Sequence, residues 1–366
     1  MPNYQHKFRL HQPTIYLSAI SLSLILGIAH GLADAAAGFL LGSLPRTMSL
    51  EQASWLIILY NILGFGYQPL AGMLTDKFQR PRLAVLGGLF SLLLGLAIAQ
   101  WHSQLAVILA GIGSAAFHVG GGALALTATP NRTTGPGIFA APGVIGLTLG
   151  GAWGWTGYKV SLPIVILLGF MMAIVAIIDL SKYDMFSHDQ ALSGKETIEY
   201  IQLDDWVLLV LLSAIALTST VWTSFQFLLQ RHLNQLVAIA FVAGIAKVFG
   251  GIFAQRWGWR RYTIVSLTIA AVLLLFYPPN YLTLILGLAL LQSSIPVTLA
   301  ATAKIMPQQP ATATGFALGL AIIVGGIPVM GGLSQIAGIP AVSALIVMVS
   351  ALSLWWVLKS KIILSR

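Results

Sequence analysis

The sequence predicts an all-α membrane protein with twelve transmembrane helices in two six-helix halves. Composition, the recurrence of long apolar stretches and the placement of charges each predict this fold class. Of the 366 residues, 57% are hydrophobic and 8% are charged, and the mean hydropathy is +0.88. Soluble domains contain about 25% charged residues. This composition excludes a water-soluble enzyme, and the absence of cysteine excludes disulfides, thiolate metal sites and cysteine nucleophiles.

Twelve apolar stretches follow one another along the chain, close to or above the roughly 20 residues that cross a bilayer as a helix. The first is predicted to be a retained helix rather than a cleaved signal peptide, because its apolar run far exceeds the about 7–15 residues of a signal core. The predicted spans are, in order, 14–42, 53–75, 83–100, 104–128, 136–156, 160–180, 205–230, 234–255, 262–277, 281–304, 312–333 and 340–358.

One long polar connection and one internal repeat predict the division into halves. The connection holds six charged residues and follows the sixth span. It predicts an N-terminal six-helix half at 1–180, a cytoplasmic linker at 181–203 and a C-terminal six-helix half at 204–366. The repeat consists of Gly72–Arg82 after the second span and Gly251–Arg261 after the eighth, with starting glycines 179 residues apart. Parallel repeats of this kind are a common plan of secondary transporters.

The basic residues predict how the chain is oriented. With both termini in the cytoplasm, fifteen of the 19 Lys and Arg residues lie in cytoplasmic segments, three lie in outer loops and Lys247 lies inside a span. Basic residues concentrate on the cytoplasmic side of membrane proteins. The predicted location is therefore the cell (inner) membrane, with multiple passes and both termini inside.

The first copy of the repeat resembles the loop motif of the major facilitator superfamily, in which a glycine, an aspartate and clustered basic residues join spans two and three. An anion is favoured at a helix N-terminus, so Asp76 can face the start of a neighbouring helix. Gln255 replaces the aspartate in the second copy, which predicts a weaker hold there. The alternative is a simple basic anchor. The motif residues are Gly72, Asp76, Lys77, Arg80, Arg82, Gly251, Arg256 and Arg260.

Several short motifs resemble one branch of that superfamily, the fosmidomycin-resistance transporters. Two departures stand out: Val119 and Gly120 follow His118 where the branch has a proline and an acidic residue, and Lys304 stands where it often has an acid. The resemblance implies proton-driven export, by antiport, of a small anionic compound such as a drug or phosphonate, and a role in antibiotic resistance. Its motifs are His30-x-x-x-Asp34, Gln68–Lys77, Gly113–His118, Ile138–Gly150 and Gly315–Gly326.

His30 and Asp34 are the predicted proton-coupling residues. Charged groups inside a membrane are costly and mark functional sites by default, and Asp34 is the one carboxylate well inside a predicted span. Residues four apart are neighbours on a helix, and imidazole titrates near neutral pH. Two alternatives stay open, a structural hydrogen-bonded pair and a zinc pair. A complete zinc site is not expected, because the sequence offers no obvious cluster to supply further ligands.

Four further polar residues inside spans are predicted to bind substrate: His118, Lys247, Gln226 and Gln292. The stretch after His118 contains three glycines, which allow close approach of a helix or a solute. The alternative for His118 is a hydrogen bond to a backbone carbonyl. Lys247 would suit an anionic cargo, although its side chain can also extend toward the membrane interface. The glutamines can equally serve as hydrogen-bonding contacts between helices.

The sequence also excludes several activities. It contains no phosphate-binding Gly-x-x-x-x-Gly-Lys-[Ser/Thr] loop, no His-Glu-x-x-His and no Gly-x-Ser-x-Gly motif. We therefore expect no enzyme, no cofactor and no metal, and the expected partners are a small-molecule substrate, protons and the lipid bilayer, without nucleic acid and with the chain as a monomer. Two alternatives stay open: proton-coupled uptake of a metabolite by symport, and a non-transporting protein that binds a hydrophobic cofactor or pigment through His30 and His118.

Overall fold

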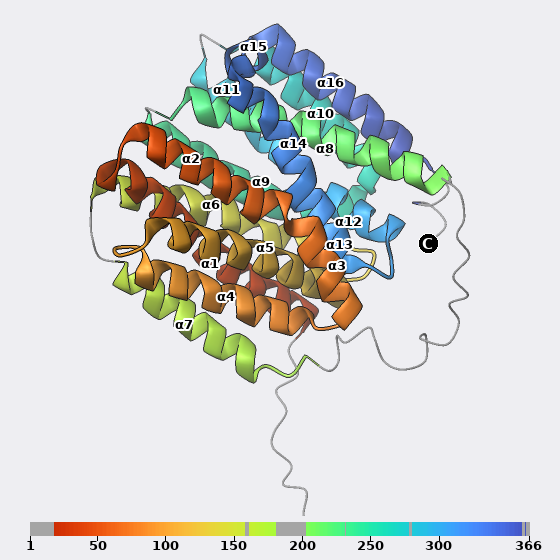
Figure 1. Ribbon diagram of the computed structural model, residues 1–366. Coiled ribbons are helices and arrows are strands. Elements are labelled where there is room, and N and C mark those ends of the chain that lie inside the picture. Colours follow the sequence, from red (N-terminus) through yellow and green to blue (C-terminus); the bar gives the residue numbers. More distant parts are fainter. Residues whose placement is uncertain are drawn as a thin grey trace, which may run out of the picture.

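The computed structural model describes residues 18–157, 161–180, 203–230, 232–277, 280–360 and 363, and these residues form a bundle of helices without strands (Figure 1). The start of the chain, 1–17, lies outside the described residues, and so does the predicted linker apart from its last residue. The two-half division, whose boundary falls there, stays a prediction.

Twelve helical spans are present in the described part of the chain, as predicted. Ten are long and apolar enough to cross a membrane; α7 and α10 are shorter, with 16 and 17 residues. The first six spans are α1 (Ala19–Thr47), α2 (Leu50–Asn61) continued through the π-helix η1 (Ile62–Gly66) into α3 (Gln68–Phe78), α4 (Pro81–Ile98), α5 (Ser103–Ala128), α6 (Thr134–Thr156) and α7 (Leu162–Ile177).

The second six spans include two that are interrupted. They are α8 (Leu203–Leu228), α9 (Leu233–Trp257), α10 (Trp259–Leu275), α11 (Tyr281–Gln292) followed by α12 (Ile295–Ile305), then α13 (Pro310–Thr314), η3 (Gly315–Leu320), α14 (Ala321–Pro328), η4 (Val329–Leu333) and α15 (Ser334–Ala337) as one irregular span, and α16 (Pro340–Val357). The sequence pattern predicted uninterrupted spans at all these places.

The π-helices η1 and η3 lie where the second and eleventh spans touch. A Cβ on Gly315 would overlap with the backbone of Gln68, and one on Gly319 would overlap with the carbonyl of Phe65. Only glycine permits so close a backbone contact. The widened turns thus place η1 and α3 directly against η3.

Each copy of the sequence repeat ends its helix at a residue with a positive φ. Gln79 follows α3 with φ of 54°, and Gly258 joins α9 to α10 with φ of 91°. Each residue stands seven positions after the first glycine of its copy. Their ψ angles differ, at 39° and 134°, so the two copies end their helices at the same position of the repeat but with different backbone conformations.

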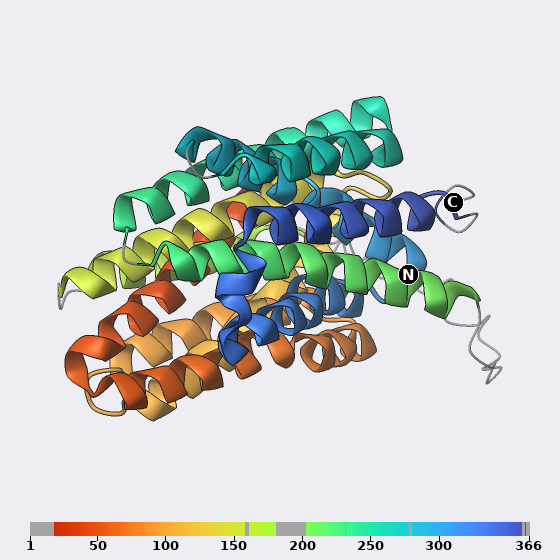
Figure 2. The same cartoon turned by 90° about the horizontal axis from the view of Figure 1, so that it is seen from above.

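Figures 1 and 2 show α1–α7 gathered mainly in one part of the bundle and most of α8–α16 in the other, with helices of both parts running along a common direction. The two parts meet where α6 packs against α9 and where α3 and α5 pack against α13. Large apolar side chains such as Phe170, Ile177 and Leu345 are exposed on the outer helices. This is the surface expected of helices that face lipid.

Candidate functional site

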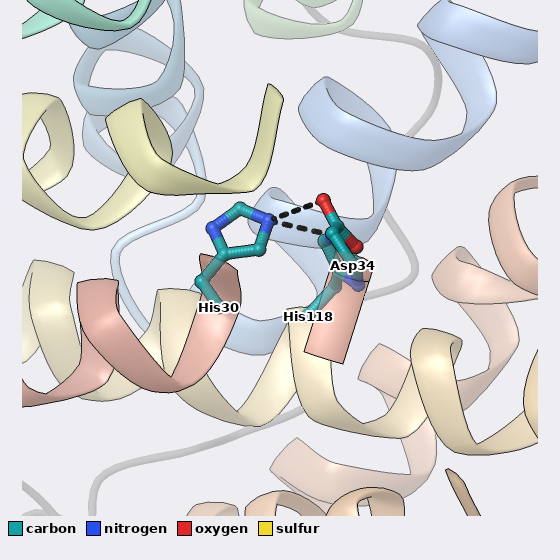
Figure 3. Close-up of side chains that lie close together, drawn as sticks. All are labelled: His30, Asp34 and His118. Carbon is teal, nitrogen blue, oxygen red and sulfur yellow. Dashed lines mark hydrogen bonds and ion pairs between the residues drawn. The ribbon is translucent and has the colours of Figure 1, made fainter. Parts of the chain in front are cut away.

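His30, Asp34 and His118 lie together inside the bundle (Figure 3). His30 and Asp34 project from one face of α1, and His118 reaches them from α5. The two histidine Nε2 atoms are 2.9 Å apart. The Asp34 carboxylate lies 3.2 Å from Nε2 of His30 and 3.5 Å from Nε2 of His118. We call these three residues the histidine–aspartate cluster; sequence reasoning paired only two of them and assigned His118 to the substrate.

Backbone carbonyls orient both imidazole rings. Nδ1 of His30 lies 2.9 Å from the carbonyl oxygen of Phe139, and Nδ1 of His118 lies 2.7 Å from that of Ser114. A carbonyl oxygen only accepts hydrogen bonds, so each Nδ1 carries the hydrogen that it donates. In a neutral imidazole the other nitrogen is then an acceptor. The Nε2 lone pairs of the two neutral rings therefore point toward each other and toward the Asp34 carboxylate.

A proton shared between the two Nε2 atoms removes the repulsion between their lone pairs. Two lone pairs at 2.9 Å repel each other, whereas one added proton turns the contact into an imidazolium–imidazole hydrogen bond beside a carboxylate. A zinc ion with bonds of about 2.0–2.1 Å would hold tetrahedral ligand atoms roughly 3.3 Å apart. The three ligand atoms are close enough to consider a metal ion, and His118 supplies the third ligand that the sequence did not reveal. The 2.9 Å contact nevertheless fits a proton better.

Helix α6 closes the cluster on a third side. The ring of Phe139 stacks on His30 with centroids 4.7 Å apart. A Cβ on Gly143 would overlap with both His30 and Asp34. The carbonyls of Phe139 and Ala140 lie in the turn of α6 before Pro142. Proline has no N–H, so this part of the helix lacks one backbone donor. Gly143 is a site residue that the sequence indicated only within the Ile138–Gly150 motif.

Lys247 approaches the same turn of α6 from α9. Its buried Nζ lies 3.4 Å from the carbonyl oxygen of Ala140, the residue after the one that anchors His30. Lys247 and Asp34 are close enough to interact electrostatically. The structure thus brings the predicted cationic residue beside the predicted proton site, with one turn of α6 between them.

Aromatic side chains surround the cluster and were not predicted. Phe117 lies 6.0 Å from the His30 ring, and Phe65 lies 6.4 Å from the His118 ring, measured between centroids. Asp34 keeps 13% of its side chain exposed, whereas both histidines are more deeply buried. Apolar walls strengthen the electrostatic interactions within the cluster.

The two predicted glutamines lie elsewhere. Gln292 is buried at the end of α11 and lines a small cavity of about 20 Å³ with Thr218 and Thr298 among its walls. Gln226 lies, partly buried, near the end of α8. Among the described residues, the hydrogen bonds and ion pairs of the histidine–aspartate cluster involve neither glutamine.

Asp76 binds the N-terminus of α13, as the motif predicted. Its two carboxylate oxygens accept hydrogen bonds from the backbone N–H groups of Ala311 (3.1 Å) and Thr312 (2.8 Å), and from the Thr312 hydroxyl (2.7 Å). A Cβ on Gly72 would overlap with the backbone of these residues. Gly72 and Asp76 therefore join the second span to the eleventh.

Gln255 makes the corresponding contact in the second copy. Its amide oxygen accepts a hydrogen bond from the backbone N–H of Thr133 at 3.0 Å, at the start of α6. The Thr133 hydroxyl donates to the carbonyl of Gly251 at 2.7 Å. We call the Asp76–Thr312 and Gln255–Thr133 contacts the two helix-end locks. They join spans two and eleven, and eight and five, at the predicted cytoplasmic end.

The basic motif residues lie around these locks. Lys77, Arg80 and Arg256 are exposed. Arg82 donates a hydrogen bond to the carbonyl of Ala176 at the end of α7, and the guanidinium of Arg260 lies 4.7 Å from the centre of the Trp355 ring.

The sequence matches the Major Facilitator Superfamily over residues 17–317, and the chain belongs to that superfamily. It is therefore a multi-pass membrane transporter rather than an enzyme. No curated protein sequence matches it. The fold is similar to that of the E. coli fucose:proton symporter FucP (TM-score 0.67, 18% identity, 93% of this chain and 98% of that chain).

Two further solved structures are similar. FucP in the outward conformation has a TM-score of 0.71 at 18% identity, covering 93% of this chain and 99% of that one. The human organic anion transporter MFSD10 has a TM-score of 0.65 at 14% identity, with 93% and 99% covered. At these identities the likeness shows the fold alone.

Proposed function

We propose that this protein is a proton-coupled secondary transporter of a small anionic compound. The histidine–aspartate cluster carries the proton, and Lys247 faces the cargo. The observation that carries this proposal is the 2.9 Å contact between the Nε2 atoms of His30 and His118, both with Nδ1 on backbone carbonyls. One bound proton makes this contact a hydrogen bond between the two imidazoles, and loss of the proton leaves two lone pairs that repel each other.

The helix-end locks support an alternating-access cycle. One lock joins α3 to α13 and the other joins α9 to α6, so each connects a helix of the predicted N-terminal half to a helix of the predicted C-terminal half. Breaking them would allow the predicted cytoplasmic end to open, while the cluster and Lys247 stay on α1, α5 and α9. The similar structures include a fucose:proton symporter and an organic anion transporter, which agrees with a proton and an anion as the two transported species.

Export by proton antiport is the direction that the sequence resemblance implies. The charges favour a second candidate, proton–anion symport. With Asp34 ionised, one proton makes the cluster neutral, so the positive charge of Lys247 is left to attract an anion. Without the proton, Asp34 offsets Lys247. Because protonation strengthens anion binding at this site, proton and anion would bind together, which is the requirement for symport.

Proteoliposomes that enclose a pH-sensitive dye test the proposal. Phosphonates, organic acids, sugars and lipophilic drugs are added outside in turn. A transported anion acidifies the lumen if the transporter is a symporter and makes it more alkaline if it is an antiporter. We expect Asp34→Asn to abolish this signal, and Lys247→Met to weaken the apparent affinity for the anion.

The matched control is Glu51→Gln, which neutralises an exposed carboxylate in the first turn of α2 and should transport normally. Full gradient-driven transport by Asp34→Asn would overturn the proposal. So would tight binding of Zn²⁺ that stops transport in the wild type and is lost in Asp34→Asn, which would assign the cluster to a metal ion. Visible absorbance that copurifies with the protein would support the cofactor-binding alternative instead.

A further inference from the structure

A large pocket lies at the predicted cytoplasmic end, away from the histidine–aspartate cluster. Its volume is about 820 Å³. It forms where the turn between α9 and α10 meets the ends of α12 and α16. Its walls are Trp257, Gly258, Trp259, Arg260, Arg261, Ile264, Val265, Lys304, Trp355, Leu358 and Ile363. We call it the basic–aromatic pocket.

Three cations line this pocket, and none of its described lining residues is acidic. Arg260 lies over the Trp355 ring at 4.7 Å, and Lys304 lies over the Trp259 ring at 5.6 Å. Lys304 also donates a hydrogen bond to the carbonyl of Ile363 at 2.6 Å. Contact with an aromatic face orients a cation without using its N–H donors. Most donors of Arg260, Arg261 and Lys304 are therefore available to an anion.

The remaining walls are apolar and continue onto the outer surface of the bundle. Ile264, Val265 and Leu358 supply these walls. Val265 is 52% exposed and Trp257 is 60% exposed, so the pocket opens toward the side that faces lipid. Tryptophan is enriched at the level of the lipid headgroups, where its ring contacts both apolar and polar surroundings. A free phosphate would fill a small part of this volume, whereas an amphipathic molecule would use both the cations and the apolar wall.

We propose that the basic–aromatic pocket binds an anionic phospholipid of the inner leaflet. The phosphate of the headgroup lies among Arg260, Arg261 and Lys304, and an acyl chain follows Val265 and the exposed face of Trp355. Clusters of basic residues at the cytoplasmic side of membrane helices attract anionic lipids. This site is separate from the proton site, so it does not depend on the function proposed above.

The test is a binding titration on the purified full-length protein in a neutral detergent, followed by native mass spectrometry. The ligands are short-chain phosphatidylglycerol, phosphatidylcholine with the same chains, and inorganic phosphate. We expect phosphatidylglycerol to bind and phosphatidylcholine to bind much more weakly. Arg261→Gln combined with Lys304→Gln should weaken phosphatidylglycerol binding roughly 30-fold, from the loss of two cations at the interface.

Arg46→Gln is the matched control, because Arg46 also lies over a tryptophan ring, Trp155, at 6.0 Å, but at the opposite end of the bundle. It should bind phosphatidylglycerol as the wild type does. If the double variant does not elute as a single species, Arg261→Gln alone gives the same test, because that side chain is exposed. Equal binding of both lipids, undiminished binding by the variants, or full competition by millimolar phosphate would overturn the proposal.

Discussion

The two histidines of the cluster are held in different ways. His30 bonds to the carbonyl of Phe139 on α6, so its ring links two helices, whereas His118 bonds to the carbonyl of Ser114 within its own helix. Loss of His30 therefore removes a contact between α1 and α6 as well as a proton site. Loss of His118 removes the proton site and a hydrogen bond within α5, but no hydrogen bond to a backbone carbonyl of another helix.

Substitution of each histidine should separate coupling from folding. We expect His118→Gln to lose proton-coupled transport with thermal stability close to that of the wild type. His30→Gln should lose transport and also about 1 kcal/mol of stability, the usual worth of a hydrogen bond. Proton flux and thermal unfolding in the same detergent would measure both. Equal destabilisation by the two variants would contradict the assigned difference.

Gly143 is the position where the cluster tolerates no side chain. A Cβ there would overlap with His30 and Asp34, so Gly143→Ala should displace the cluster and reduce transport strongly. Gly87 on α4 is a matched control, because a Cβ at that position meets nothing within 4 Å. Gly87→Ala should keep full transport and gain up to about 1 kcal/mol, since alanine favours the helix. Transport by the Gly143 variant at the wild-type level would contradict this reading of the site.

At the scale of elements, close helix pairs position the site. A Cβ on Gly146 would overlap with the carbonyl of Gly31, and one on Gly150 with that of Ala35. Glycine and alanine at helical spacing let the backbones of α1 and α6 touch. This contact brings the His30 ring within hydrogen-bonding distance of the Phe139 carbonyl. The sequence indicated these α6 glycines only as part of the Ile138–Gly150 motif.

The two helix-end locks are chemically unequal. Asp76 makes three hydrogen bonds with a charged acceptor, whereas Gln255 makes weaker contacts through a neutral amide. Hydrogen bonds to charged groups are worth about 1.5–3 kcal/mol and neutral ones about 1 kcal/mol. The first lock should therefore dominate the closed state of this end.

Asp76→Asn should shift the protein toward a state that is open at this end, and Gln255→Leu should shift it less. Spin labels on His102→Cys and His232→Cys, at exposed positions on the opposite end, would report the change. The label distance should shorten as that end closes, and more for the Asp76 variant. The chain has no native cysteine to interfere. An equal or reversed order of the two variants would contradict the unequal locks.

At the scale of the whole molecule, the distribution of basic residues predicts the orientation. Gln308 and His102 lie in exposed connections at opposite ends of the bundle. In intact cells an impermeant maleimide should label His102→Cys and should label Gln308→Cys only after the membrane is opened. The reverse pattern would contradict a cytoplasmic location of both termini.

Much of the architecture follows from the sequence because hydropathy is a local property. The twelve apolar stretches form twelve spans, and the two copies of the repeat, which start at Gly72 and Gly251, form the two helix-end locks at corresponding positions. The i, i+4 spacing of His30 and Asp34 already placed them on one face of a helix. The interruptions at η1 and η3 were not predictable, because they arise from contact between two distant spans.

Tertiary structure alone decided which polar residues meet. His118 lies 88 positions after His30, and Lys247 lies 107 positions after Ala140. A transmembrane helix is apolar toward lipid and toward its neighbours alike, so its sequence does not tell which face turns inward. The sequence by itself therefore determined the spans, the repeat and the family, while the rotation of α1, α5, α6 and α9 against one another assembled the cluster and set Lys247 beside it.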